Sequence, residues 1–183
     1  MPAGAEGATL HPGLTTPNRD SESRHLRIFV TGADGFLGAN TVRRLLTAGH
    51  RVRAFLEPES TAATLEGLPI ERATGDVTSF ENVYSAMRGC DAVVHAAGCT
   101  ATWPNRSALV HRVNVTGTRN VVEAALCMAV SRFVHVSSAG VFAPGTREVP
   151  GDERRLRSVG RHKLGYTRSK ALAHQLVAEA AKT

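Results

Sequence analysis

Short apolar runs, rich in β-branched residues, alternate with segments of helical periodicity along most of this chain. The apolar runs are residues 26–30, 51–56, 70–73, 92–96 and 132–136. Helical spacing of apolar residues is found in 39–48, 80–87, 107–129 and 166–182, and more weakly in 60–66. Strands that alternate with helices form a parallel sheet that is covered on both faces. The sequence therefore predicts a doubly wound α/β fold in three layers, α/β/α.

The first part of the chain differs in composition from the rest. Residues 1–25 are rich in Gly, Pro, Thr, Ser and Ala and have no apolar periodicity, which is typical of a flexible tail. We therefore expect a tail over 1–25 and one folded domain over 26–183. The chain has no run of eighteen apolar residues and no secretory leader pattern, and its three cysteines form no CxxC pair. These features favour a cytoplasmic protein with reduced thiols, no membrane span and no metal site.

The net charge of +6 is concentrated in one segment. Residues 154–170 contain seven Lys and Arg residues and no acidic residue, so this segment alone exceeds the net charge of the chain. A protein that follows a nucleic-acid backbone spreads basic residues over a face. The distribution favours a solvated charge run in a loop and helix, and it argues against a nucleic-acid partner.

A glycine-rich turn, TGADGFLG at residues 31–38, follows the first predicted strand and opens the first predicted helix. The N-terminus of a helix offers unpaired N–H groups and a positive dipole end, where a pyrophosphate can bind. Glycines allow the tight turn and the close approach of the backbone that such binding requires. The spacing is GxxGxxG, and a purely structural turn is the alternative interpretation. In its strand–turn–helix context the motif predicts a dinucleotide site.

An acidic residue at the end of the second predicted strand would hold the ribose hydroxyls of the cofactor. Glu57 stands at this position, although a solvated charge at the strand end is an equal alternative. A carboxylate there would repel a 2′-phosphate, which favours NAD, with NADP as the alternative cofactor. Arg53 lies in the same strand, but the direction of its side chain is not determined by the sequence.

A tyrosine and a lysine, Tyr166 and Lys170, lie four residues apart in the last predicted helix and therefore share a face. An ammonium beside a phenol favours phenolate and suits proton transfer to or from an alcohol oxygen. The pair is a weak motif by itself. Its weight comes from Ser137 and Ser138, which follow the fifth predicted strand, where the ligand crevice of an α/β sheet opens.

Five motifs in this order resemble the extended short-chain dehydrogenase/reductases. They are TGxxGxxG, Gly75-Asp76, His95-Ala96-Ala97-Gly98, Ser137-Ser138 and YxxxK. The resemblance is to the NAD-dependent epimerase/dehydratase family and its dihydroflavonol-reductase-like members. It implies a Rossmann-like NAD(P)-binding domain and an NAD(P)-dependent oxidoreductase that interconverts a small-molecule secondary alcohol and a ketone, of epimerase or reductase type.

The resemblance also assigns residues. It places the cofactor pyrophosphate on Gly32, Gly35, Phe36, Leu37 and Gly38, the adenine beside Asp76 and Val77, and the ribose side of the cleft on Ala96, Ala97 and Gly98. Ser138 matches the catalytic serine better than Ser137 does. Tyr166 would be the general acid/base, and Lys170 would bind the nicotinamide ribose and tune Tyr166. Asn114 matches an asparagine that supports the active site, with a packing role as the alternative.

The chain also departs from the family pattern. Ala139 and Gly140 stand where 4,6-dehydratases carry an Asp-Glu pair, so that elimination is not expected. The family continues past the YxxxK helix into further strands and a substrate lobe, so a truncated sheet is expected here. Oligomeric state is left open, although family members commonly pair as homodimers through the helices represented by 107–129 and 166–182.

The sequence also allows two other functional hypotheses. A non-catalytic dinucleotide-binding protein, or an inactive fragment, is the main alternative to an enzyme. Nucleic-acid binding through the basic segment is a weaker one. His95 and His135 occupy strand positions and are interpreted as structural. Trp103 is interpreted as a loop anchor, or as a platform that faces the substrate.

Overall fold

The computed structural model describes residues 25–101, 107–156 and 165–182. The predicted tail up to residue 24, Trp103, and residues 157–164 of the basic segment therefore lie outside the described residues. The strands are β1 (Arg27–Thr31), β2 (Arg51–Leu56), β3 (Glu71–Thr74), β4 (Ala92–His95) and β5 (Arg132–His135). The main helices are α1 (Phe36–Thr47), α2 (Phe80–Met87), α3 (Ser107–His111), α4 (Thr118–Cys127) and α5 (Gly165–Ala180).

The five strands form one parallel sheet in the order β3-β2-β1-β4-β5. The strand order reverses at β1, because β2 pairs on one side of it and β4 on the other. Ligands of open α/β sheets bind outside the carboxyl ends of the strands at such a reversal. The prediction of a doubly wound parallel sheet is confirmed.

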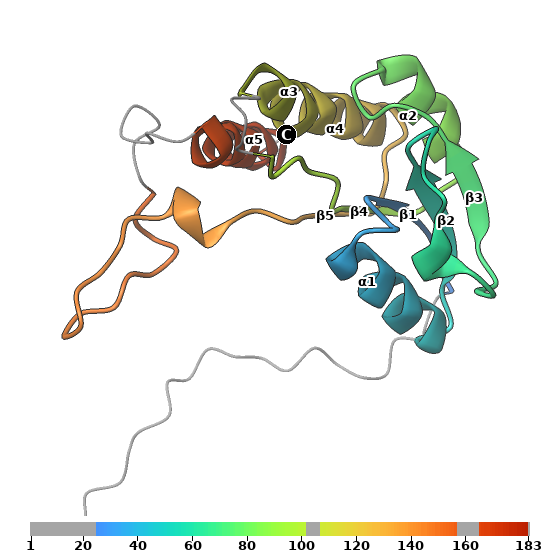
Figure 1. Cartoon of the computed structure of the whole chain (residues 1–183), viewed down its shortest axis with the longest axis horizontal. Coiled ribbons are helices and arrows are strands. Elements are labelled where there is room, and N and C mark those ends of the chain that lie inside the picture. Colours follow the sequence, from blue (N-terminus) through green and yellow to red (C-terminus); the bar gives the residue numbers. More distant parts are fainter. Residues whose placement is uncertain (1–24, 102–106, 157–164, 183) are drawn as a thin grey trace, which may run out of the picture.

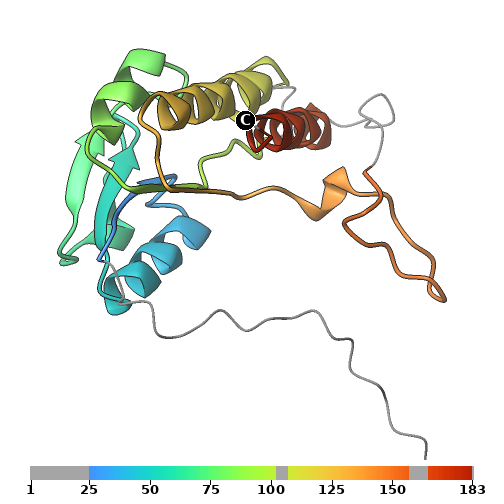
Figure 2. The same cartoon turned by 180° about the vertical axis from the view of Figure 1, so that it is seen from behind.

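Helices cover both faces of the sheet. Figure 1 shows α1 on one face and α2, α4 and α5 on the other, and Figure 2 shows the same layers from behind. The alternation of side chains along β1 explains the two cores, since Ile28 and Val30 pack toward α1 while Phe29 packs toward α2 and α4. All three side chains are buried.

Three predicted helices differ in detail from those observed. The first begins at Phe36 rather than at Ala39 and ends where Gly49 adopts a φ of +83°. The weak helix over 60–66 is only a 3₁₀ turn, Ala63–Leu65, because Ala62 before it is left-handed. The long helix over 107–129 is interrupted by a π-helical segment, Arg112–Gly117. Such segments insert one residue per turn and often occur at functional sites.

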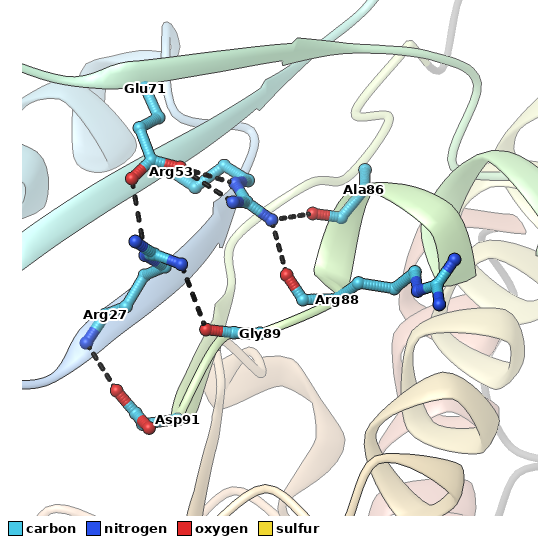
Figure 3. A network of polar contacts seen from close by, with 7 residues as sticks. All are labelled: Arg27, Arg53, Glu71, Ala86, Arg88, Gly89 and Asp91. Carbon is cyan, nitrogen blue, oxygen red and sulfur yellow. Dashed lines mark hydrogen bonds and ion pairs between the residues drawn. The ribbon is translucent and has the colours of Figure 1, made fainter.

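A charged network joins the amino-terminal edge of the sheet to the end of α2 (Figure 3). Arg53 donates to Glu71 Oε2 at 2.7 and 2.9 Å, and its Nη1 donates to the carbonyl oxygens of Ala86 at 2.8 Å and Arg88 at 2.7 Å. The guanidinium thus satisfies carbonyl groups at the C-terminal end of the helix, where a cation is favoured. The pKa of Glu71 is lowered from its ordinary value, chiefly by its hydrogen bond to Arg53.

The direction of Arg53, which the sequence left open, follows from this network. Its side chain is bound at the edge of the sheet opposite to the carboxyl ends of the strands. It is therefore not available to bind a cofactor 2′-phosphate.

Candidate functional site

The glycine-rich turn connects β1 to α1. Its backbone comes close to the loop after β4 at Gly32, and the first turn of α1 comes close to the turn itself at Gly38. Gly32 has a φ of +62°, and a Cβ atom there would lie 2.7 Å from the backbone nitrogen of Ala97. A Cβ on Gly38 would lie 1.9 Å from the carbonyl oxygen of Gly32, so the first turn of α1 packs directly on the glycine loop. No larger residue fits at either position without movement of the backbone.

The N-terminus of α1 is open to a ligand. Gly35 is the N-cap and makes no side-chain capping bond, and the first turn of the helix contains no acidic residue. Phe36 and Leu37 follow, with 91% and 51% of their surfaces exposed. The first N–H groups of a helix have no intrahelical partner, so this end can bind an anionic group such as a pyrophosphate.

A cavity of about 220 Å³ lies beside this turn, at the carboxyl ends of the central strands. Seven residues expected from the sequence line it, namely Gly32, Gly35, Glu57, Val77, Ala96, Ala97 and Gly98. The cavity also has three lining residues that the sequence analysis did not assign, Asp34, Phe55 and Gly75. Gly75 belongs to the Gly-Asp motif and Asp34 to the glycine turn, so their positions in these motifs were the available signal.

A second cavity, of about 270 Å³, adjoins the first at Glu57. Asp76 lines the second cavity, and its Oδ1 accepts a hydrogen bond from Thr78 N at 2.8 Å. Val77 lines the first cavity, and its carbonyl oxygen accepts a hydrogen bond from Asn120 Nδ2 at 3.0 Å. The Gly-Asp-Val segment therefore separates two hollows that share Glu57.

The residues of this region fit a dinucleotide. The glycine turn presents a backbone cradle, the open end of α1 suits a phosphate, and the carboxylate of Glu57 at the cavity wall can accept hydrogen bonds from ribose hydroxyls. Asp34 adds a second carboxylate at this wall and accepts a hydrogen bond from Ser60.

The tyrosine and lysine lie on α5, above the carboxyl end of β5. Lys170 is buried, with 6% of its surface exposed, and its Nζ donates to Val136 O at 2.6 Å. Burial lowers the pKa of Lys170 from its ordinary value. Tyr166 lies one turn earlier on the same helix and is half-buried. Ser138, Tyr166 and Lys170 line neither of the two cavities described above.

The two serines after β5 have different partners. Ser137 Oγ is hydrogen-bonded to His174 Nδ1 at 3.1 Å, whereas Ser138 Oγ accepts only a local bond from Gly140 N at 3.2 Å. The turn after Ser138 contacts α5, since a Cβ on Gly140 would lie 3.3 Å from Thr167 Cγ2. This arrangement favours Ser138 over Ser137 as the serine that faces a substrate.

Asn114 lies in the π-helical segment and is buried, with 2% of its surface exposed. Its Oδ1 accepts from Cys99 N at 2.7 Å, and its Nδ2 donates to Cys99 O at 3.0 Å and to Ser169 Oγ at 2.9 Å. The amide thus joins the loop after β4 to α5. A role in holding these elements together is favoured over direct contact with a substrate.

The strand histidines are uncharged at neutral pH. His95 has 1% of its surface exposed. Its pKa is lowered to about 3, chiefly by burial and further by the nearby charges of His135 and Lys170. The pKa of His135 is lowered to about 4, chiefly by burial and further by the nearby charges of Lys170 and His174. Within the described residues no group of three or more His, Cys, Asp or Glu side chains is arranged to hold a metal ion. In the same part of the chain no helix has the length and apolar character needed to cross a bilayer.

Known proteins share this sequence and fold. The model of the NAD dependent epimerase/dehydratase family matches residues 28–183. The chain is 37% identical over 155 residues to a 4-hydroxy-2-methyl-3-oxo-4-farnesyl-3,4-dihydroquinoline-1-oxide ketoreductase of Stigmatella aurantiaca, covering 85% of this chain and 46% of the relative. It is 37% identical over 159 residues to a 3-beta-hydroxysteroid dehydrogenase of Mycolicibacterium neoaurum, covering 82% and 42%.

A similar solved structure is the Bordetella bronchiseptica enzyme WbmG in complex with NAD. Its TM-score is 0.72 at 25% identity, and the match covers 90% of this chain and 52% of that one. The chain thus spans about half the length of the relatives that it matches. The family match extends over nearly all of the described residues and includes the glycine turn, the paired serines and the tyrosine–lysine helix. The chain therefore belongs to the NAD-dependent epimerase/dehydratase family.

Proposed function

We propose that this chain carries the cofactor-binding and proton-transfer residues of an NAD-dependent oxidoreductase that interconverts a secondary alcohol and a ketone. The observation that carries the proposal is the buried ammonium of Lys170, held by Val136 O one helical turn from Tyr166. A buried cation beside a phenol stabilises phenolate and lowers the barrier to proton transfer.

The chain's residues have distinct roles in this proposal. Bound cofactor would supply the hydride chemistry, with NAD⁺ as the acceptor in oxidation of the alcohol and NADH as the donor in reduction of the ketone. Glycines 32, 35 and 38 hold the pyrophosphate on the end of α1, and Glu57 accepts from the ribose hydroxyls of the adenosine half. Tyr166 takes the proton of the alcohol or returns it to the ketone oxygen. Ser138 donates a hydrogen bond to that oxygen. Lys170 lies one helical turn from Tyr166 and binds the nicotinamide ribose.

The substrate class follows from the chemistry and from the relatives. A ketoreductase and a 3-beta-hydroxysteroid dehydrogenase both act at a secondary alcohol or ketone carbon. A panel for this chain therefore includes a 3β-hydroxysteroid and a 2-alkyl-3-oxoalkanoate, the latter after a reductase relative from Shewanella oneidensis.

Replacement of Tyr166 by Phe tests the proposal. We expect Tyr166→Phe to lower turnover by about 10²- to 10⁴-fold, the usual contribution of a general acid/base, with NAD affinity unchanged. Tyr84→Phe is the matched control, because Tyr84 is the other tyrosine and stacks on Phe80 in α2. NADH absorbance gives the rate, and titration of NADH fluorescence gives the affinity. Equal turnover in Tyr166→Phe and Tyr84→Phe would contradict the mechanism.

A further inference from the structure

Five buried polar residues form a hydrogen-bonded path between the cofactor turn and the tyrosine helix, which passes from the backbone carbonyl of Asn114 to its side-chain amide. Each has 2% or less of its surface exposed, and they are Thr31, His95, Thr118, Asn114 and Ser169. They come from β1, β4, α4, the π-helical segment and α5. A buried polar group must find a partner inside the protein, so the geometry of such a chain is tightly constrained.

The direction of each hydrogen bond around His95 can be deduced. Thr118 Oγ1 donates its only proton to Asn114 O at 2.7 Å, so it must accept from His95 Nε2 at 2.9 Å. A neutral imidazole has one N–H group, and His95 Nδ1 is therefore an acceptor. Thr31 Oγ1 then donates to Nδ1 at 2.7 Å, while it accepts from Ala97 N at 3.2 Å. Each hydroxyl and the ring N–H group in this part of the path therefore donates to one acceptor.

The surroundings of His95 favour this neutral form. The ring of His135 stacks on it at 5.4 Å, and the ring of Phe133 lies at 6.5 Å. The titratable groups that face it are His135 and Lys170, and both disfavour a positive charge on His95. A second proton on Nδ1 would also displace the proton that Thr31 donates, leaving that hydroxyl without an acceptor.

The two ends of the chain reach the two halves of the proposed site. At one end, Thr31 Oγ1 accepts a hydrogen bond from Ala97 N, next to the point where Gly32 packs against the loop after β4. At the other end, Asn114 Nδ2 donates to Ser169 Oγ at 2.9 Å, and Ser169 Oγ donates to Tyr166 O at 2.7 Å. Ser169 immediately precedes Lys170 in α5. One hydrogen-bonded path thus connects the glycine turn to the first turn of the tyrosine helix.

We propose that His95 is a positioning residue, locked as the Nε2–H tautomer, which orients the π-helical turn at Asn114 and through it sets α5 against the cofactor turn. The effect on turnover rests on the function proposed above. The tautomer and the link to α5 do not.

The first experiment measures the tautomer without reference to activity. In the 183-residue chain labelled with ¹⁵N-histidine, two-bond ¹⁵N–¹H correlation spectra distinguish the two neutral tautomers and the cation. The His95 signals are assigned by their loss in His95→Gln. We expect Nε2 to be protonated and Nδ1 unprotonated at pH 7.5, with no change at pH 5. A protonated Nδ1, or a charged ring at pH 5, would overturn the proposal.

The second experiment breaks the chain at Thr118. Thr118→Val removes the hydroxyl at constant volume, and Thr118→Ser is the matched control that keeps it. We expect faster amide hydrogen exchange of residues 166–170 in Thr118→Val and wild-type rates in Thr118→Ser, measured by NMR. Equal exchange in the two variants, with both folded by circular dichroism, would contradict the link to α5.

Kinetics then separate positioning from cofactor binding. We expect Thr118→Val to lower kcat by about 10- to 100-fold, the cost of a small misplacement of a reacting group, with NAD affinity within a factor of about two. Thr118→Ser should restore kcat. A parallel loss of kcat and NAD affinity would refute a specific role in positioning Tyr166. Absence of turnover in the wild-type chain would count against the proposed function, and the tautomer and exchange measurements then decide the inference.

Discussion

At the scale of single residues, the choice of cofactor depends on carboxylates at the cavity wall. Glu57 lines both cavities, and Asp34 lines the first. Arg53, the arginine in the strand that leads to Glu57, is bound to Glu71 and to the end of α2. A 2′-phosphate would therefore meet negative charge, and the geometry agrees with the NAD dependence of the family.

Replacement of Glu57 by Gln should weaken this preference. The charged acceptor for the ribose hydroxyls is lost and so is its repulsion of a 2′-phosphate, so we expect NADH to bind about tenfold or more weakly. NADPH should bind no worse than it does to the wild-type chain. Glu66→Gln, at an exposed position outside both cavities, is the control. Fluorescence titration with both cofactors measures the change, and an unaltered ratio of the two affinities would contradict the role of Glu57.

The buried histidines predict acid sensitivity. Their folded pKa values, about 3 for His95 and about 4 for His135, lie below the ordinary 6.5, so the unfolded state binds more protons between these values. The free energy of unfolding should therefore fall as pH falls from 6.5, by up to about 1.4 kcal/mol per pH unit for each histidine.

The window from pH 6.5 to 4.5 isolates the histidines from Glu71. The lowered pKa of Glu71 causes loss of stability only below its ordinary value of 4.5. Urea unfolding at several pH values measures the slope. His135→Phe should have a shallower slope, because it removes one titrating group. Among the described residues neither ring nitrogen of His135 has a hydrogen-bond partner, so the substitution breaks no hydrogen bond there. An identical slope in wild type and His135→Phe would show that His135 is not the titrating group.

At the scale of secondary-structure elements, the packing of α1 on the glycine turn depends on one missing side chain. A Cβ at position 38 would overlap Gly32 O, whereas a Cβ at position 35 would lie 3.4 Å from it. We expect Gly38→Ala to lower Tm by roughly 5–10 °C and Gly35→Ala to leave it nearly unchanged. Differential scanning fluorimetry measures both. Equal Tm values for the two variants would mean that the turn relaxes around a methyl group.

The end of α2 offers a second test at this scale. Arg53→Leu leaves two carbonyls at the end of α2 without their donor and leaves Glu71 with Arg27 as its remaining ion-pair partner, and we expect a loss of about 1–3 kcal/mol in unfolding free energy. The ratio of NADH to NADPH affinity should not change. Arg154→Leu is the control, because the Arg154–Asp152 pair is on the surface, with 89% of the arginine side chain exposed. A shifted cofactor ratio in Arg53→Leu would place Arg53 at the cofactor site after all.

At the scale of the whole molecule, the described residues form a sheet with its cofactor crevice and leave β5 at one edge. An apolar groove lies between α4, α5 and Phe133 of β5, and Leu126 in its lining is about half exposed. Pairing of two copies through these helices stays a prediction. So does the division into a tail over 1–25 and a domain over 26–183.

Whether this chain binds NAD by itself is testable directly. If the crevice is formed as described, NAD at about a hundred times its Kd adds about 2.7 kcal/mol, which corresponds to a rise in Tm of roughly 5–11 °C. Gly38→Ala serves as a variant with a blocked cradle. A rise in Tm without turnover on the alcohol and ketone panel would favour the non-catalytic alternative. No rise at all would contradict both hypotheses.

The fold and most residues that line the first cavity were predictable from the sequence, because both depend on local patterns. Alternating apolar runs predicted the five strands, and the spacing of glycines placed the turn at the head of α1. Glu57, Val77 and Ala96 were predicted as site residues because each lies at or shortly after the end of a predicted strand, and all three line the first cavity. The weak helix predicted over 60–66 was wrong, since Ala62 is left-handed and only a 3₁₀ turn, Ala63–Leu65, follows it.

The chain's sequence by itself determined which segments are strands and helices and where a dinucleotide can meet the sheet. Only the tertiary structure decided the partners of its buried polar groups. Arg53 is bound to the end of α2, Asn114 joins Cys99 to Ser169, and His95 lies between two threonines from different elements. These pairs are up to 64 residues apart along the chain. Their hydrogen bonds depend on which elements pack together, and no local pattern in the sequence records that.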